Sequence, residues 1–278
     1  MFSGRKLLIA TKHKKEAVIA PILEEELGVT CFVDLNFDSD QLGTFTGEIE
    51  RLEDPLTTVR NKCLMAMELA NCDLAVASEG SFGPHPSFFF AHADDEFLIL
   101  IDKKNNLEII IRELSLETNF NGTLISSSTE LREFAKNYNF PSHALIIRES
   151  DSDNKEIIKG ITNWEILVEA FDYFFKKNGN AYIETDMRAM YNPTRMNVIR
   201  NATKKLAKKI LSCCPNCTTP GFGVSEVKAG LPCKLCNLPT KSTLSHIYKC
   251  DKCSFEQEEK YPHEKQNEDP MYCDFCNP

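Results

Sequence analysis

The sequence predicts a mixed α/β domain, followed by a basic helix and a module with two Cys₄ zinc sites. Strand-like and helix-like segments alternate over the first 175 residues, which is typical of an α/β fold. A β-hairpin is predicted over 97–112, in the middle of that region, so a mixed sheet sandwich fits better than an all-parallel sheet. Four Cys-x-x-Cys pairs lie in the last quarter of the chain and indicate bound metal.

The first part of the α/β region gives two strands and two helices. Apolar runs at 7–11 and 31–35 predict buried strands, and apolar residues at helical spacing predict a helix over 14–27 between them. A second helix is predicted over 55–69. Asp54 is a favourable N-cap there, and proline is favoured at the first helical position that follows.

The centre of the region is rich in short apolar and aromatic runs. They predict strands over 74–77, 87–91, 97–101 and 107–112. The last two strands flank a polar turn and therefore form a hairpin. Beyond the hairpin, the pattern predicts a helix over 128–138, a strand over 144–148 and an amphipathic helix over 164–175.

The residue pattern changes after position 178. We expect an α/β domain at 1–178, a polar linker and basic helix at 179–212, and a zinc module at 213–278. Pro193 begins the predicted helix, which runs to about Leu211. Seven basic residues and no acidic residue lie between 187 and 213, so this helix has a positively charged face.

Composition and charge limit the classes of function. The 278 residues have a net charge of −9, which disfavours binding of duplex nucleic acid by the whole surface but leaves a local basic groove open. No apolar run reaches the roughly 18 residues that a membrane span needs. The start of the sequence lacks the apolar region of a signal peptide. We therefore expect a cytoplasmic protein without a membrane partner, and a homodimer is its candidate assembly.

Eight of the twelve cysteines form four Cys-x-x-Cys knuckles. The pairs are Cys214 with Cys217, Cys233 with Cys236, Cys250 with Cys253, and Cys273 with Cys276. Two thiolates three positions apart on a tight turn can face one metal ion, and two such turns complete a tetrahedral site. Four knuckles therefore predict two closed structural Zn²⁺ sites, and this spacing favours metal over disulfides.

The partners of the knuckles are left open by the sequence. In a nested arrangement, the knuckles between 233 and 253 form a zinc ribbon, and the two outer knuckles share the second ion. In a sequential arrangement, the first two knuckles share one ion and the last two share the other. Zinc ribbons bind nucleic acid or protein or only brace a domain, and the acidic residues of this module favour a brace or a protein contact.

Short segments of the α/β domain point to phosphate chemistry. The first is the strand-to-helix turn of Thr11, Lys12, His13, Lys14 and Lys15. Backbone N–H groups at a helix start and nearby ammonium groups attract phosphate. Glu79 follows a strand beside Gly80 and could hold Mg²⁺, with Glu48 as a second carboxylate and Arg60 as an orienting cation. The alternative is that these are solvated lysines and a turn acid without a ligand.

In their order and spacing, these segments resemble the inosine/xanthosine triphosphatase family, which are pyrophosphatases for non-standard purine nucleotides. The matching segments are Thr11–His13, Arg60–Lys62, Glu79–Gly80, Phe97–Ile111, Ala144–Arg148 and Ile161–Asn163. The resemblance covers about residues 5–175 and implies an inosine-triphosphatase-like fold with Mg²⁺-dependent hydrolysis of a nucleotide. The whole architecture also looks like a family of bacterial proteins for which no activity is established.

The sequence departs from the triphosphatase pattern. Its Asn in the first turn is His13 here, its following Lys is Glu16, and the Arg expected after Thr162 is Asn163. Each lost charge-assisted phosphate contact is worth roughly 1 kcal/mol or more, so triphosphate binding would be weaker.

A charged segment lies between the two predicted domains. This segment holds Asp186, Arg188 and Arg195, and it could fold back so that Arg188 or Arg195 replaces the missing cations at the phosphate site. Alternatively they form an ion-paired linker, with Asn192 capping the helix that starts at Pro193. We favour the structural interpretation.

Two functions follow from this pattern. The leading hypothesis is an Mg²⁺-dependent nucleoside triphosphate phosphohydrolase with a structural two-zinc tail. The alternative is a non-enzymatic zinc-ribbon protein on a degenerate nucleotide-binding fold, which binds nucleic acid or protein. Its candidate nucleic-acid contacts are Lys204, Lys205, Lys208 and Lys209.

Overall fold

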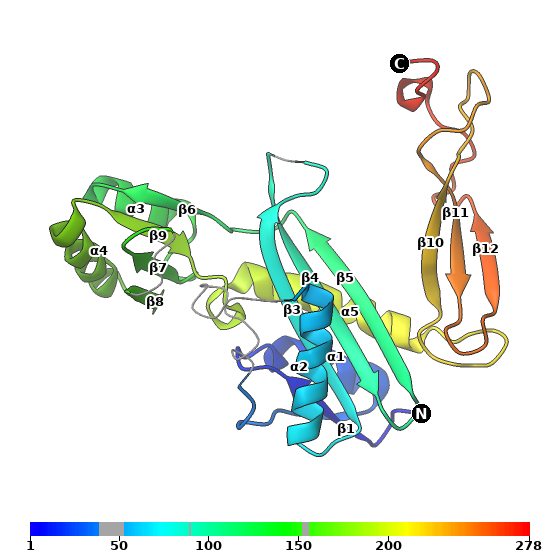
Figure 1. Ribbon diagram of the computed structural model, residues 1–278, viewed down its shortest axis with the longest axis horizontal. Helices are drawn as coiled ribbons and strands as arrows, with labels where there is room; N and C mark the ends of the chain where they lie inside the picture. Colours follow the sequence, from blue (N-terminus) through cyan, green and yellow to red (C-terminus); the bar gives the residue numbers. More distant parts are fainter. Residues whose placement is uncertain (39–52, 89, 152–155) are drawn as a thin grey trace. The chain divides into compact units, whose positions relative to one another are not determined.

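The chain divides into two units, Met1–Ala207 and Lys208–Pro278. The computed structural model describes residues 1–38, 53–88, 90–151 and 156–278, so the predicted metal ligand Glu48 lies outside the described residues. The expected mixed α/β architecture is confirmed, with several sheets instead of one (Figure 1).

The first unit contains a five-stranded mixed sheet in the order β2-β1-β3-β4-β5. Its strands are β1 (Lys6–Ala10), β2 (Thr30–Phe32), β3 (Leu74–Pro84), β4 (His92–Asp102) and β5 (Leu107–Ser115). β1 runs parallel to β2 and β3, whereas β3, β4 and β5 are antiparallel neighbours. The predicted central hairpin is confirmed as β4 and β5.

The strand predicted over 87–91 is wrong. Those of its residues that the structure describes belong to the turn between β3 and β4, where Ala91 N–H donates to the Phe88 carbonyl at 2.9 Å. Pro84 and Pro86 bracket the start of this turn and have no N–H group to donate to a ladder. β3 is correspondingly longer than predicted, because its polar second half pairs with β4 as far as Pro84.

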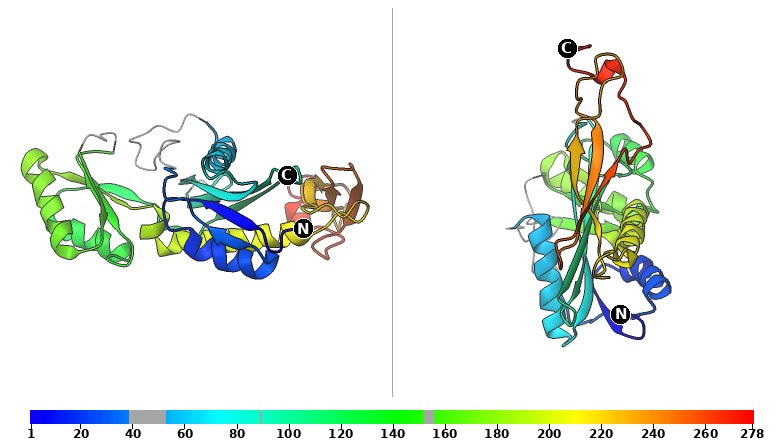
Figure 2. Two further views of the ribbon diagram at one scale, coloured as in Figure 1. Left: turned by 90° about the horizontal axis from the view of Figure 1, so that it is seen from below. Right: turned by 90° about the vertical axis from the view of Figure 1, so that its right-hand side faces the viewer.

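Helices cover both faces of this sheet. Figure 2 shows α2 (Pro55–Leu69) on one face, and α1 (Glu16–Leu27) and α5 (Pro193–Leu211) on the other. The predicted bounds of α2 and its Asp54 cap are confirmed, since the Asp54 side chain accepts from the N–H groups of Leu56 and Thr57. The core between α2 and the sheet is apolar, with Val59, Cys63 and Ala66 fully buried.

A second, four-stranded antiparallel sheet belongs to the same unit. Its strands are β6 (Gly122–Ile125), β7 (Leu145–Arg148), β8 (Ile157–Ile161) and β9 (Ala181–Thr185), in the order β6-β9-β7-β8. α3 (Ser128–Asn137) and α4 (Trp164–Asn178) pack on it. β9 falls in the segment predicted as a linker, but it pairs with both β6 and β7 and completes the sheet.

The second unit is a three-stranded antiparallel meander. It consists of β10 (Gly223–Ala229), β11 (Thr243–Lys249) and β12 (Glu256–Lys260). One knuckle precedes β10, one follows each of β10 and β11, and the fourth follows β12. The meander therefore sets the positions of all four knuckles.

Candidate functional site

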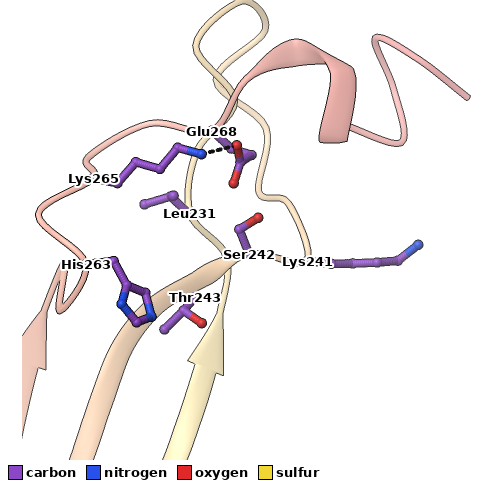
Figure 3. A pocket seen from close by; sticks show the side chains of 7 residues that line it. All are labelled: Leu231, Lys241, Ser242, Thr243, His263, Lys265 and Glu268. Carbon is purple, nitrogen blue, oxygen red and sulfur yellow. Dashed lines mark hydrogen bonds and ion pairs between the residues drawn. The ribbon is translucent and has the colours of Figure 1, made fainter. Parts of the chain in front are cut away.

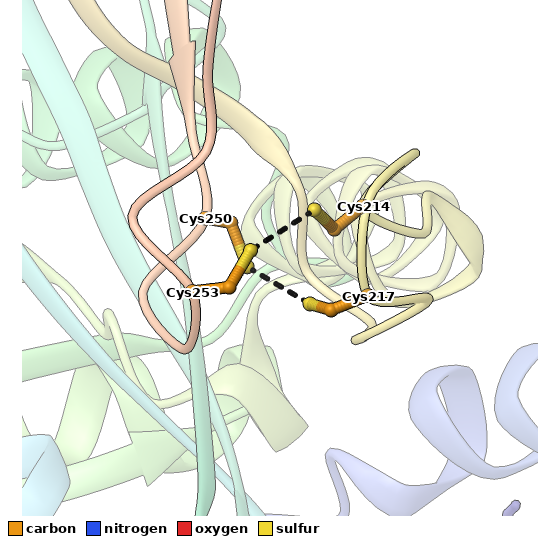
Figure 4. A group of neighbouring side chains, drawn as sticks. All are labelled: Cys214, Cys217, Cys250 and Cys253. Atoms are coloured by element: carbon orange, nitrogen blue, oxygen red, sulfur yellow. Dashed lines mark hydrogen bonds between the residues drawn. The ribbon is translucent and has the colours of Figure 1, made fainter.

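The eight predicted zinc-binding cysteines form two groups of four. Within each group, the Sγ atoms all lie within 4.8 Å of one another. In the first group, two Sγ–Sγ distances between facing knuckles are 3.7 and 3.6 Å (Figure 4). The corresponding distances in the second group are 3.8 and 3.6 Å. Four Zn–S bonds of about 2.3 Å at tetrahedral angles require about 3.8 Å between sulfurs. Each group therefore has the spacing of a Cys₄ zinc site.

The knuckles are shared in an interleaved order. The first Cys₄ group, called the first zinc centre because it could hold one ion, consists of Cys214, Cys217, Cys250 and Cys253. The second Cys₄ group, called the second zinc centre, consists of Cys233, Cys236, Cys273 and Cys276. Neither the nested nor the sequential arrangement is present. In an antiparallel meander each strand carries the chain to the opposite end, so consecutive knuckles lie at alternate ends of the sheet.

Three knuckles share one backbone conformation. The residue after the second cysteine has a positive φ, at 58° for Thr218, 62° for Asn237 and 58° for Ser254. Its N–H donates at 2.9 Å to the carbonyl oxygen of the first cysteine of its knuckle. This turn is tight enough to point both thiols at one metal ion. Its last residue adopts the left-handed conformation, which costs Asn less than most other residues.

Cysteine and histidine residues outside the knuckles do not join either group. Cys213 is exposed. The His246 and His263 rings meet edge to face at 5.5 Å, on the meander and the loop after it.

The first unit contains a buried charged cluster. Its members are Lys15, Lys62, Glu79, Asp94, Glu96 and Arg195, each less than a tenth exposed. Removing an ion from water costs several kcal/mol even after relaxation, about 20 in the idealised limit, so such groups are rare without a partner or a function.

Two lysines of the cluster meet at one backbone carbonyl. Lys15 Nζ lies 2.9 Å from Ser78 Oγ and 3.3 Å from the Ser78 carbonyl oxygen. Lys62 Nζ reaches the same carbonyl oxygen at 3.3 Å and forms an ion pair with Glu79. Burial, followed by the charge of Arg195, lowers the pKa of Lys15 to about 7.

Arg195 binds the other side of the cluster. Its Nε donates to Glu96 Oε1 at 2.6 Å, and its Nη1 donates to the Met187 carbonyl at 2.6 Å. Asp94 lies two residues before Glu96 on β4, and no donor among the described residues contacts either of its carboxylate oxygens. Burial and the charge of Glu96 raise the pKa of Asp94 to about 8.

Comparison with known protein families gives one finding. The family model described as "Domain of unknown function (DUF6671)" matches residues 62–278. The chain belongs to the DUF6671 family. The match includes both zinc centres and most of the buried cluster. No curated protein matches the DUF6671 chain.

Glycine is required at position 80 because Glu96 lies opposite it on β4. A Cβ atom at Gly80 would overlap the Glu96 carboxylate and lie 2.6 Å from Arg195 Nη2. We expect Gly80→Ala to destabilise the first unit by about 1–3 kcal/mol through overpacking. Urea unfolding followed by the fluorescence of the single tryptophan, Trp164, measures this change.

Gly83→Ala is the matched control on the same strand. A Cβ atom there meets nothing within 4 Å, so its effect should stay within about 0.5 kcal/mol. Equal losses of stability in the two variants would show that the ion pair of Glu96 and Arg195 can move to make room for a Cβ atom at position 80.

The residues of the predicted phosphate turn have different environments. Thr11 and Lys15 are buried, whereas Lys12 and Lys14 are exposed. Lys12 forms an ion pair with Asp38 at 2.9 Å, and the Thr11 hydroxyl accepts from the His13 N–H at 3.2 Å. Lys15 is the member of the buried cluster that this turn contributes, and its Nζ contacts Ser78.

Arg60, the predicted orienting cation, pairs with Glu108 outside the buried cluster. Lys62 is the cation of this motif that contacts Glu79. The Arg60 guanidinium pairs with Glu108 on the exposed surface, with Nε at 3.0 Å from Oε1. The buried face of α2 includes Val59, Lys62 and Ala66, at helical spacing. This periodicity was the signal for an inward-facing lysine in the Arg60–Lys62 motif.

The charged segment after β9 has structural contacts. Asp186 accepts from Gly160 N–H at 3.0 Å and pairs with Arg188 Nη2 at 2.6 Å. Asn192 Oδ1 accepts from Arg195 N–H at 3.0 Å and caps α5, as expected. These contacts support the ion-paired interpretation for Asp186 and Arg188, whereas Arg195 folds back onto the buried cluster and pairs with Glu96.

The four lysines predicted to contact nucleic acid are not equivalent. Lys205 pairs with Glu113, and burial lowers the pKa of Lys209, whose side chain lies against Gly223. Lys204 and Lys208 are exposed. No helix in the described part of the chain combines the length and apolar character that a bilayer crossing requires.

Proposed function

We propose that the first unit binds the phosphate groups of a nucleoside triphosphate at Lys15 and Lys62 and hydrolyses a phosphoanhydride bond, and that the second unit holds two structural zinc ions. The single observation behind the first part is that two buried ammonium groups converge on the Ser78 carbonyl. The order of motifs shared with the inosine/xanthosine triphosphatases supports the choice of ligand.

The position of the lysines in the sheet supports a ligand site. β1 ends at Ala10, which pairs with Ala77 of β3, so the next residues of β3 have no β1 partner. Ligands of open α/β sheets bind beyond the carboxyl ends of parallel strands. The Ser78 carbonyl, the Thr11 turn and the first residues of α1 all lie at this edge.

The spacing of the two lysines also supports an anionic ligand. Both Nζ atoms lie 3.3 Å from one carbonyl oxygen, so they are close enough for one phosphate group to contact both. Of the cluster's carboxylates, Glu79 forms the ion pair with Lys62. A phosphate at this position would stabilise the ammonium form of Lys15, and Lys15 would supply at this turn the cation that the triphosphatase pattern lacks at Glu16.

Magnesium fits these residues poorly. Mg²⁺ prefers six oxygen ligands in octahedral geometry, usually one or two carboxylates together with waters and substrate phosphates. Glu79, the carboxylate predicted to hold it, already contacts Lys62. The site is therefore proposed through its lysines, and no step depends on a metal ion held by Glu79.

We expect Lys15→Met and Lys62→Met each to weaken triphosphate binding by about ten- to a hundredfold, because each removes a charge-assisted hydrogen bond worth about 1.5–3 kcal/mol. Calorimetric titration with ATP, ITP and XTP measures binding, and pyrophosphate or phosphate release measures hydrolysis. Arg60→Met is the control, and its affinity should stay within about twofold of the parent, since exposed ion pairs contribute little. Lys62→Met alone leaves the Glu79 carboxylate buried without its partner, so Lys62→Met/Glu79→Gln is measured beside it.

The proposed phosphate contact fails if no triphosphate binds the unaltered protein, or if Arg60→Met weakens binding as much as the two lysine variants do. Binding without any release of pyrophosphate or phosphate would retain the site and reject the hydrolase.

Triphosphate binding should also take up a proton above neutral pH. The pKa of Lys15 is about 7 in the free protein, so most molecules carry a neutral amine at pH 8. A bound phosphate favours the ammonium form, and affinity should therefore fall by up to about tenfold per pH unit above pH 7 and level off below it. Calorimetry at pH 8 in buffers of different ionisation enthalpy measures the uptake. Lys15→Met should abolish it, and the same uptake in that variant would contradict the assignment.

The alternative function of polynucleotide binding through α5 has weaker support. Two of its four lysines have intramolecular contacts, so fewer phosphate groups could be bound.

A further inference from the structure

We propose that the second zinc centre is a docking site for a protein segment that combines large apolar residues with lysine or arginine. This inference is independent of the phosphate site. The side chains that carry it are Leu235, Leu238, Met271, Tyr272 and Phe275, which we call the apolar cap. All but Leu238, which is 39% exposed, are between 60% and 73% exposed.

The cap residues lie within or next to the two knuckles of one metal site. Leu235 lies between the two cysteines of the second knuckle, and Phe275 lies between those of the fourth. Met271 and Tyr272 precede Cys273, and Asp269 fixes their turn by accepting from the Met271 N–H at 2.9 Å. Because the knuckles share one metal site, the five side chains lie on neighbouring turns.

The first zinc centre shows that an exposed apolar cap is not needed for a knuckle. The corresponding positions within its knuckles are Pro215, Asn216, Asp251 and Lys252. Its large apolar neighbours, Phe222, Tyr248 and Phe255, pack against the cysteines. Large exposed apolar groups are a common mark of protein contact sites, and Tyr, Phe and Met are enriched in them.

Charge near the cap identifies the kind of partner. The segments 230–242 and 264–278, which carry this centre, contain three lysines and four acidic residues. A zinc ion with four thiolates adds two negative charges. Lys241 pairs with Asp274 at 2.9 Å, and Lys265 pairs with Glu268. The surroundings are therefore negative, which complements a basic partner.

The same charges disfavour two other occupants. A second copy of the chain would place two negative zinc centres against each other. A nucleic acid would bring phosphates to a surface whose lysines at 241 and 265 already have carboxylate partners. A basic, apolar protein segment meets neither repulsion.

A hollow beside the cap gives room for a partner side chain. It has a volume of about 340 Å³ and is lined by Leu231, Lys241, Ser242, Thr243, His263, Lys265 and Glu268 (Figure 3). The Glu268 backbone joins it to the second centre, because Lys234 N–H donates to the Glu268 carbonyl at 2.9 Å. In this wall, the Glu268 carboxylate pairs with Lys265 and accepts from the Asp269 N–H at 2.7 Å.

The test uses a phage-displayed library of random twelve-residue peptides, selected on the zinc-loaded full chain. Leu235→Ser/Phe275→Ser removes two cap residues, and Val224→Ser/Val227→Ser is the control on exposed residues of β10 in the same unit. Each variant must retain two zinc ions per chain. Selected peptides should contain several large apolar residues with Lys or Arg, and should bind the cap variant at least about tenfold more weakly than the parent and the control.

Three outcomes would overturn the proposal. Peptides that bind the parent and the cap variant equally would show that the cap is not the site. Self-association of the parent in sedimentation experiments that is lost in the cap variant would identify a second copy as the occupant. Binding of single-stranded oligouridylate that is lost in the same variant would identify a nucleic acid.

Discussion

Removal of zinc is expected to unfold Lys208–Pro278 and leave Met1–Ala207 folded. The second unit has a small apolar core, in which Phe222 and two zinc cysteines are the buried members of the described cluster. Metal binding supplies about 10–16 kcal/mol to small structural zinc sites, which is more than such a core can replace. Hydrogen exchange before and after treatment with a strong chelator measures the change.

The expected exchange pattern differs between the units. Amides of β10, β11 and β12 should lose protection, whereas those of β3 and β4 should keep it. Cys213→Ser is the control, because this exposed thiol belongs to neither zinc centre, and the variant should behave as the parent does. A metal-free protein with a fully protected meander would show that zinc does not stabilise the second unit.

Arg195→Met is expected to destabilise the first unit by about 3–5 kcal/mol, because it leaves Glu96 buried without its partner. The Arg195 and Glu96 side chains are fully buried, and Asp94 beside them is also fully buried. Urea unfolding followed by Trp164 fluorescence gives the free energy of unfolding.

Two variants separate lost charge pairing from lost helix packing. Arg200→Met changes an exposed arginine of the same helix and should alter stability by no more than about 0.5 kcal/mol. Arg195→Met/Glu96→Met replaces the pair by apolar groups and should recover at least half of the loss, because such replacements are often neutral. No recovery in the double variant would mean that Arg195 acts through its packing instead.

Helix caps and turns were predicted correctly where a few neighbouring residues determine them. The Asp54 cap gave the start of α2, and the apolar pattern around a polar turn gave the β4–β5 hairpin. β9 was missed because Ala181–Thr185 is short and alternates with polar residues, and its strand character comes from pairing with β6 and β7. The Phe-rich run at 87–91 has strand propensity, but the two prolines before it cannot donate to a ladder.

The cysteine spacing predicted which residues form the zinc centres but not their partners. A knuckle is a local turn, so its two thiols are set by the sequence between them. The sharing of knuckles depends on the three strands between them, and a meander places alternate knuckles together. Because one strand of the meander lies between each two consecutive knuckles, the knuckles are shared in the interleaved order.

The residues of the proposed phosphate site could be predicted only in part. The turn at Thr11 and the strand end at Glu79 do meet at one sheet edge, because β1 and β3 are parallel neighbours. Lys62 was missed in favour of Arg60, although only Lys62 shares the buried face of α2. The ion pair between Lys62 and Glu79 joins residues 17 positions apart and depends on the packing of α2 on the sheet.

The interleaved zinc centres are tested most directly by the zinc content of double cysteine variants, measured by mass spectrometry after dialysis against a weak chelator. Cys214→Ser/Cys250→Ser removes two ligands of one centre and should keep one zinc ion per chain. Cys214→Ser/Cys233→Ser and Cys214→Ser/Cys276→Ser damage both centres and should keep none. Retention of one ion by either of the latter two, with none in the first, would contradict the interleaved arrangement.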